Sequence, residues 1–260
     1  AVQRRGFSLL GLAHSVPASS VLVILGLWIR KDIDETPDFQ KVKKSGQVAK
    51  APLRDTIKHH WREVLIAAGL KVVETAPFYI FSTFVVSYAT TTLTYQKSQA
   101  LEAVTLGALV ATIMIPLMGL LSDRVGRERM YAVSGFVLGL FFVPWFMLLN
   151  TGTTWGIVLA TVIAFGVLWA PVTAVLGTLC SEIFSANVRY TGITLGYQLG
   201  AALAGGTAPL IATGLLAKYD GDWVPVAWYL GVTVAISLIA IFCASRINRE
   251  RHLQVQPEQR

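Results

Sequence analysis

The sequence is poor in the residues that build most catalytic and metal sites. Only two of its 260 residues are Cys and four are His, and neither type recurs at the spacing of metal ligands, so no metal site is expected. Cys180 and Cys243 fall within or at the ends of apolar runs, where they serve as small apolar residues. The sequence contains no Ser-His-Asp order, phosphate-binding glycine loop or HExxH motif, and it therefore shows no sign of an enzyme.

Charge is also scarce, and this scarcity places the chain in a bilayer. Charged residues make up 14% of the sequence and hydrophobic residues 54%, with a mean hydropathy of +0.58, which is unlike a soluble domain. A bilayer of about 30 Å requires roughly 20 helical residues. Six continuously apolar runs reach that length and predict helices, since lipid-exposed backbone must satisfy its own hydrogen bonds. The runs are Leu65–Leu93, Leu101–Leu121, Met130–Leu149, Trp155–Ile183, Thr191–Ala217 and Val224–Ala244.

Basic residues are distributed very unevenly between the two ends of these runs. On one side, Arg30–Arg62 carries nine Lys or Arg, the loop around residue 126 carries three, Arg189 adds one and the C-terminal tail four. The other side has only Lys97 and Lys218. Because Lys and Arg favour cytoplasmic loops, the richer side and the C-terminus are predicted to be cytoplasmic. This topology accounts for the net charge of +7, and no nucleic-acid partner is expected.

Two ionisable residues lie inside the first apolar run. Lys71 and Glu74 are three residues apart, so they share one helical face and can pair with each other. One interpretation is structural, with Lys71 reaching toward the cytoplasmic end and Glu74 as its local partner. The other is functional, because a buried carboxylate beside a water-filled cavity can carry a coupling proton or balance the charge of a substrate.

The stretch "TGITLGYQLGAALAGG" combines small and polar residues. Gly192, Gly196 and Gly200 recur every four residues, which predicts a smooth face for close packing of another helix. Tyr197 and Gln198 lie between them and are candidates for lining a polar path. Prolines within or at the ends of the runs favour kinks; they are Pro77, Pro116, Pro144, Pro171, Pro209 and Pro225.

The segment "GLLSDRVGRERM" concentrates charge between two apolar runs. Gly126 permits a tight turn, and Asp123 can bond to nearby arginines or to the N-terminus of an adjacent helix. Such a contact would form a latch that breaks when the helices separate.

This segment resembles the G-x-L-[SA]-D-R-x-G-R-[RK] loop signature of the major facilitator superfamily of secondary transporters. In that superfamily the signature occurs between helices 2 and 3 and again between helices 8 and 9. Two runs precede it here, so the resemblance implies the second copy. Glu128 stands where the family usually has a basic residue, and Arg129 is expected to take its place. The gating residues implied are Gly119, Asp123, Arg124, Gly126, Arg127 and Arg129.

Three further stretches resemble the metabolite:H+ symporter branch of that superfamily: "ETPDF", "ETAPFYIFSTFVVSYAT" and "SEIFSANVRYTGITLGYQLGAALAGGTAPLIAT". The resemblance implies an all-α integral membrane protein, a six-helix bundle forming the C-terminal half of a twelve-helix fold. It divides the chain into a truncated helix 6 at 18–30, a central cytoplasmic loop at 31–63, helices 7 to 12 at 64–244 and a cytoplasmic tail at 245–260.

The branch implies a transporter in the bacterial inner membrane that couples proton flow to the uptake of an organic acid, shikimate or a zwitterion such as proline or betaine. The proton is the coupling ion, and no cofactor is implied. Lys71, Glu74, Tyr197 and Gln198 are the candidates for the proton or substrate path. The chain alone is expected to be inactive without an N-terminal half. Two alternatives stay open: a membrane-anchored scaffold whose Arg30–Arg62 segment binds a partner or anionic lipid, and a parallel dimer of two halves.

The first residues suggest a damaged reading frame. The branch is expected to carry W-G-W-R-I-P-F before helix 6, whereas this chain reads "GLAHSVP" at residues 11–17. One coding of the expected stretch, TGGGGCTGGCGCATTCCGTTCC, translates as G-L-A-H-S-V-P from its third base. We therefore expect residues 1–17 to be out of frame or unstructured, as in a frameshifted fragment of a longer gene.

Overall fold

The computed structural model describes residues 23–26, 28 and 52–255, with side chains up to residue 248. The chain divides into two units, Ala1–Val48 and Ala49–Arg260. In the first unit the described residues are helical. The segment at 1–17 and most of the expected truncated helix at 18–30 lie outside the described residues.

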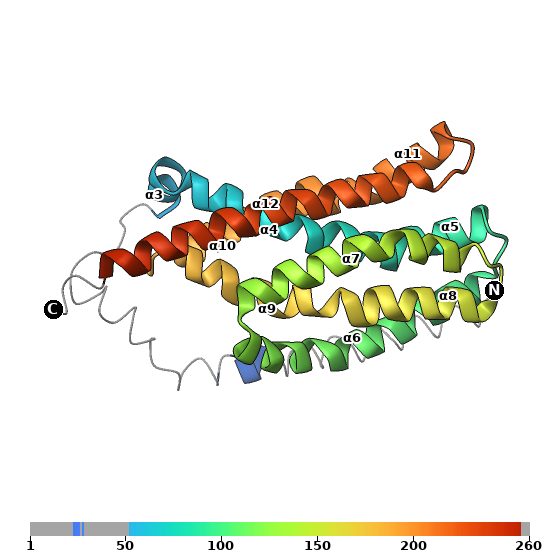
Figure 1. Cartoon of the computed structure of the whole chain (residues 1–260), viewed down its shortest axis with the longest axis horizontal. Coiled ribbons are helices and arrows are strands. Elements are labelled where there is room, and N and C mark those ends of the chain that lie inside the picture. Colours follow the sequence, from blue (N-terminus) through green and yellow to red (C-terminus); the bar gives the residue numbers. More distant parts are fainter. Residues whose placement is uncertain (1–22, 27, 29–51, 256–260) are drawn as a thin grey trace. The chain divides into compact units, whose positions relative to one another are not determined.

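The second unit is a bundle of six helical spans, as the apolar runs predict (Figure 1). No strand occurs among the residues that the structure describes. Each span is long and apolar enough to cross a membrane. Three spans consist of several helical elements: α4 (Trp61–Tyr79), η1 (Ile80–Phe84) and α5 (Val85–Thr91); α8 (Thr154–Thr161), η2 (Val162–Leu168) and α9 (Ala170–Ile183); α10 (Arg189–Gly200), η3 (Ala201–Gly205) and α11 (Ala208–Lys218). The other three are α6 (Lys97–Val125), α7 (Arg127–Leu149) and α12 (Val224–Val255).

A further helix, α3 (Pro52–His59), precedes the bundle. The segment expected to form the central cytoplasmic loop, 31–63, is described from residue 52 on, where it contains α3 and the start of α4 at Trp61. Asp55 in the first turn and Lys58 in the last turn of α3 both complement the helix dipole. His60 separates the two helices with non-helical backbone angles.

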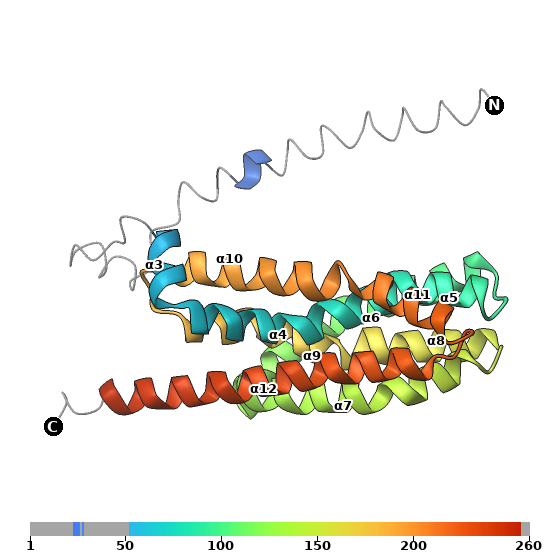
Figure 2. The same cartoon turned by 90° about the horizontal axis from the view of Figure 1, so that it is seen from above.

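Helix α4 lies between α10 and α12 and packs against both (Figure 2). Side chains of three other spans donate hydrogen bonds to its main-chain carbonyls. Tyr131 Oη of α7 bonds to the Leu70 carbonyl at 2.5 Å, and Ser237 Oγ of α12 bonds to Gly69 at 2.6 Å. Trp169 Nε1 bonds to the carbonyl of Glu74 at 2.7 Å. These bonds hold α4 in the bundle where lipid offers no alternative partner.

Aromatic side chains fill the core at the end of the bundle where α7 ends and α12 begins. The Trp145 ring packs edge-on against Phe81 and Phe146, with centroids 5.1 and 4.7 Å apart. Phe146 in turn stacks on Trp223 at 5.1 Å. The core therefore joins α7 to the first span and to the start of α12.

Three spans contain a π-helical segment, and each segment lies close to a proline. The Trp169 N–H bonds to the Ala164 carbonyl, five residues back, just before Pro171. The same pattern links Gly206 to Ala201 ahead of Pro209. The first segment, Ile80–Phe84, follows Pro77. The prolines thus mark sites where the α-helical hydrogen-bond pattern is interrupted.

Candidate functional site

The charged loop between α6 and α7 is a single-residue turn. Gly126 has φ = 95°, a left-handed value that suits glycine. Its N–H bonds to the Ser122 carbonyl, which closes α6, and its carbonyl accepts the Met130 N–H, which starts α7. As a result Asp123 in the last turn of α6 faces Arg127, the first residue of α7.

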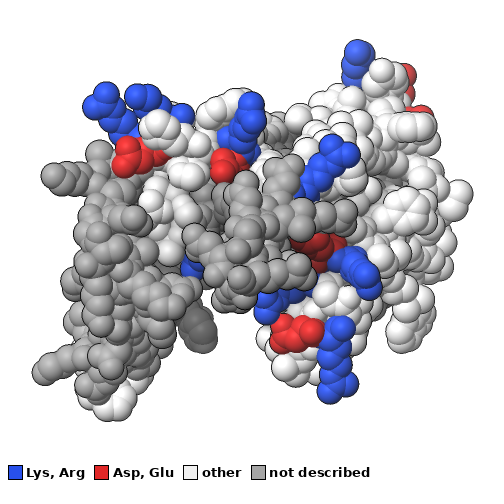
Figure 3. Space-filling model, turned by 60° about the vertical axis from the view of Figure 1, so that its left-hand side comes forward, with Lys and Arg blue, Asp and Glu red and all other residues white. Residues whose placement is uncertain are grey.

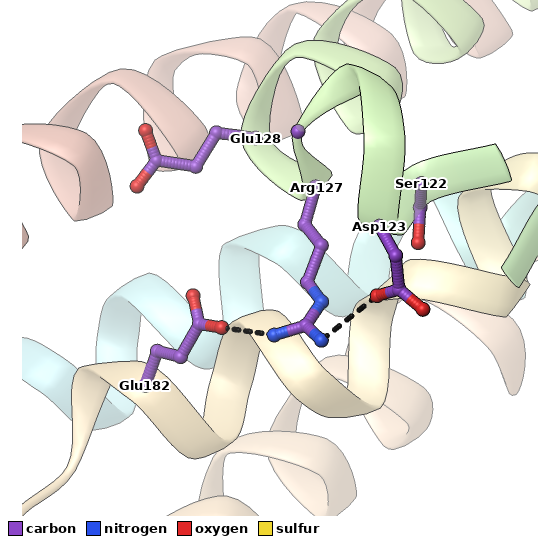
Figure 4. A pocket seen from close by; sticks show the side chains of 6 residues that line it. Ser122, Asp123, Arg127, Glu128 and Glu182 are labelled. Atoms are coloured by element: carbon purple, nitrogen blue, oxygen red, sulfur yellow. Dashed lines mark hydrogen bonds and ion pairs between the residues drawn. The ribbon is translucent and has the colours of Figure 1, made fainter. Parts of the chain in front are cut away.

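Arg127 joins two carboxylates from different spans (Figure 4). Its guanidinium lies 3.0 Å from Asp123 Oδ1 and 2.6 Å from Glu182 Oε1, which belongs to α9. These groups line an open pocket of about 380 Å³. We call Asp123, Arg127 and Glu182 the loop latch. Sequence reasoning missed Glu182, although its position as the one carboxylate near the end of the apolar run Trp155–Ile183 could have drawn attention to it.

Glu128 points away from the latch and binds α12 instead (Figure 4). Its carboxylate accepts hydrogen bonds from Ser245 Oγ at 2.6 Å and Asn248 Nδ2 at 3.1 Å. The departure from the family signature therefore serves a contact between α7 and α12. Arg124 and Arg129 are exposed, and neither forms an ion pair with any described residue. A Cβ atom at Gly119 would meet open space.

The two intramembrane ionisable residues form a close ion pair. Lys71 Nζ lies 2.5 Å from Glu74 Oε2, and the side chains are 17% and 13% exposed. Thr75 donates its hydroxyl hydrogen to the same oxygen at 2.8 Å. Lys71 is ten residues from the start of α4, roughly 15 Å along the helix at 1.5 Å per residue. The pair is therefore well inside the span.

Tyr197 on α10 completes this polar cluster. The Lys71 Nζ atom lies 4.8 Å from the centroid of the Tyr197 ring, close enough for a cation–π contact. A Cβ atom on Gly177 of α9 would lie 3.9 Å from the Tyr197 hydroxyl oxygen. We call Lys71, Glu74 and Tyr197 the span cluster. The next residue, Gln198, is exposed and shows no hydrogen bond within the described part of the chain, so three of the four expected path residues meet.

The regularly spaced glycines let α10 approach α4. A Cβ on Gly196 would lie 2.5 Å from Ala67 Cβ, and one on Gly200 would lie 2.6 Å from both the Ala68 carbonyl oxygen and Lys71 Cβ. Gly192 differs, because it faces the Phe184 ring at the end of α9 and not the surface of α4. Close packing at Gly200 is thus what brings Lys71 to Tyr197.

Comparison with known proteins agrees with this architecture. The family model of the Major Facilitator Superfamily matches residues 6–205 and 72–260. The chain is 29% identical to the shikimate transporter of Escherichia coli (strain K12), over 82% of this chain and 49% of that protein. It is 30% identical to the ectoine/proline transporter ProP of Corynebacterium glutamicum, over 85% of this chain and 45% of that protein. It is 28% identical to the inner membrane metabolite transport protein YhjE of Escherichia coli (strain K12), over 86% of this chain and 51% of that protein.

Six membrane-spanning helices, a charged interhelical loop and an ion pair inside a span are features of a membrane transporter. The chain belongs to the Major Facilitator Superfamily, a family of transporters and not of enzymes. It spans about half the length of the curated relatives that it matches. No solved structure matches it significantly.

Proposed function

We propose that the chain supplies the C-terminal half of a proton-coupled transporter for a small organic acid or a zwitterionic metabolite. The observation that carries this proposal is the Lys71–Glu74 ion pair inside a membrane span. Ionisable residues are costly in a bilayer and are found mainly where they serve a substrate or an ion. The names of the relatives, which include shikimate and ectoine/proline transporters, support the substrate class.

The span cluster offers a simple route for coupling. When Glu74 takes up a proton, it loses its negative charge, and the Lys71 ammonium loses its ion-pair partner. Lys71 is then free to bind a carboxylate, the group that organic acids and zwitterionic amino acids share. When Glu74 releases this proton, its carboxylate pairs with Lys71 again and displaces the substrate. The proton is the coupling ion, and no further cofactor is proposed.

The loop latch is the proposed gate. It links α6 and α7 to α9 through charged side chains that are 37% to 59% exposed. Exposed pairs of this kind contribute only about 0–1 kcal/mol to stability, so they can break during each transport cycle. The gate would open as α9 moves away from the turn at Gly126.

A second six-helix half is the proposed partner, since transporters of this class hold substrate between two halves that rock against each other. That half is either an N-terminal six-helix segment or a second copy of this chain. We place the protein in the bacterial inner membrane with its C-terminus in the cytoplasm, in keeping with the inner-membrane relative. Figure 3 shows Lys and Arg side chains on the end of the bundle where α3 lies. Their presence supports the proposed orientation, because Lys and Arg favour the cytoplasmic side of a membrane.

Substitution Glu74→Gln tests the proposed coupling. The chain is joined to the N-terminal half of the Escherichia coli shikimate transporter and uptake of labelled shikimate is measured from pH 5 to pH 8. We expect Glu74→Gln to abolish the dependence of uptake on pH, because the amide cannot take up a proton. Glu102→Gln is the matched control, since Glu102 is an exposed carboxylate near the start of α6. Unchanged pH dependence in Glu74→Gln would remove this residue from the coupling path.

Substitution Arg127→Gln tests the gate. We expect the unfolding temperature to change little, because the pairs are exposed, while hydrogen exchange increases in peptides covering residues 122–130 and 181–186. Hydrogen–deuterium exchange of the reconstituted protein measures this opening. Arg124→Gln provides the control, because Arg124 is in the same loop and forms no ion pair with the described residues. Equal exchange in both variants would contradict the latch.

A further inference from the structure

A stripe of large apolar side chains runs from α3 into α4 and lies exposed. Leu53, Ile57, Trp61 and Leu65 are 54%, 58%, 51% and 57% exposed. Leu53 and Ile57 are four residues apart on α3 and share one side of that helix, and Trp61 and Leu65 are four residues apart on α4 and share one side of it. Thr56 on another side of α3 is fully buried. The short helix therefore presents its apolar residues outward, the reverse of what a helix in water would do.

Basic side chains accompany this stripe along its whole length. Arg54, Lys58 and Arg62 each directly follow an apolar residue of the stripe, and all three are exposed. The Arg62 guanidinium carbon lies 5.4 Å from the centroid of the Trp61 ring, which holds this cation beside the aromatic residue. We call these seven residues the α3 surface. It combines an exposed apolar stripe with a row of positive charge.

The direction of α3 differs from that of the bundle. The six spans run along the long axis, whereas α3 lies across one end of them, as the two perpendicular views show (Figures 1 and 2). This is the same end as the loop latch. Because the spans are expected to cross the membrane, a helix that lies across their end is expected to run parallel to the membrane surface. Its apolar residues are followed on α4 by the exposed side chain of Leu65.

We propose that the α3 surface anchors this end of the bundle in the bilayer, with its apolar stripe at the acyl boundary and its basic row on anionic phospholipid headgroups. Helices that lie in a membrane interface have this combination of an apolar face and a basic polar face. Trp61 occupies the depth at which tryptophan is enriched in membrane proteins. The negative lipid surface complements Arg54, Lys58 and Arg62. This inference concerns the membrane surface and does not depend on the transport proposal.

The test places a nitroxide label on each of two adjacent residues of α3. Ile57→Cys and Lys58→Cys are made in a Cys180→Ala, Cys243→Ala background, labelled, and reconstituted in vesicles of phosphatidylethanolamine and phosphatidylglycerol. Collision rates are measured with oxygen, which concentrates in lipid, and with a water-soluble nickel chelate. We expect the Ile57 label to favour oxygen and the Lys58 label to favour the nickel chelate.

A second measurement addresses the headgroup. In the background with the Ile57 label, replacing Arg54 and Arg62 by Gln should reduce lipid partitioning of α3 by about 5-fold for each charge removed, from the attraction of anionic lipid for a basic residue. Vesicles of phosphatidylcholine alone should give a similar reduction without any substitution. A nickel collision rate at Ile57 equal to that at Lys58 would overturn the proposal. Protection of both labels from both reagents would also overturn it and would indicate a protein partner.

Discussion

Replacing Lys71 by Met should destabilise the bundle by about 3 kcal/mol, the lower end of the range for removing one partner of a buried ion pair, because these two side chains are 17% and 13% exposed. The Glu74 carboxylate would keep the Thr75 hydroxyl as a hydrogen-bond donor but lose the ammonium 2.5 Å away. An unpaired carboxylate within a membrane span is costly. Thermal unfolding in detergent micelles, followed by circular dichroism, measures the loss.

The double variant Lys71→Met/Glu74→Gln provides the control for this prediction. Because it removes both charges, its stability should recover most of the loss, as replacement of buried pairs by neutral residues often does. A double variant as unstable as Lys71→Met would show that the lysine acts through packing against Tyr197 and Gly200. In that case the ion pair would not be the source of the effect.

Replacing Gly200 by Ala should cost about 1–3 kcal/mol, the usual range for overpacking a tight interface. The added methyl would lie 2.6 Å from the Ala68 carbonyl oxygen and from Lys71 Cβ, so α10 must move away from α4. The shift would also lengthen the distance between Lys71 and the Tyr197 ring. Unfolding temperature in micelles is again the measurement.

Gly214→Ala is the matched control, because Gly214 lies in the same span and a Cβ there would meet no atom within 4 Å. We expect the unfolding temperature of this variant to equal or exceed that of the parent protein, since alanine is more favourable than glycine in a helix by about 1 kcal/mol. If both glycine variants unfold at the same temperature, the close approach of α10 to α4 contributes nothing to stability.

Patterns within short stretches of the sequence predicted much of this architecture, because the spans, the turn and the intrahelical ion pair each depend on residues that are close together in the chain. The six apolar runs predicted six spans, since a continuous apolar run in lipid can satisfy its backbone only as a helix. Gly126 predicted the turn, and Asp123 predicted a contact with an arginine; the structure has φ = 95° at Gly126 and a 3.0 Å pair with Arg127. Lys71 and Glu74 are neighbours on one helix face, so their pairing required no knowledge of other helices.

Other features involve partners that are distant in the chain. Glu182 reaches Arg127 across 55 residues, and Glu128 reaches Ser245 across 117. Tyr197 meets Lys71 only because Gly196 and Gly200 allow α10 to press against α4. No local spacing encodes such pairs, since they depend on which helices pack together and at what height.

By itself, the sequence determined the membrane environment, the number of spans, the turn at Gly126 and the Lys71–Glu74 pair, because hydropathy and helical spacing act over a few residues. Only the tertiary structure decided that Arg127 binds Glu182, that Glu128 binds α12, that Gln198 stays apart from the span cluster, and that α3 lies across the end of the bundle. These depend on helix packing, which brings together side chains from distant parts of the chain and sets which of them meet.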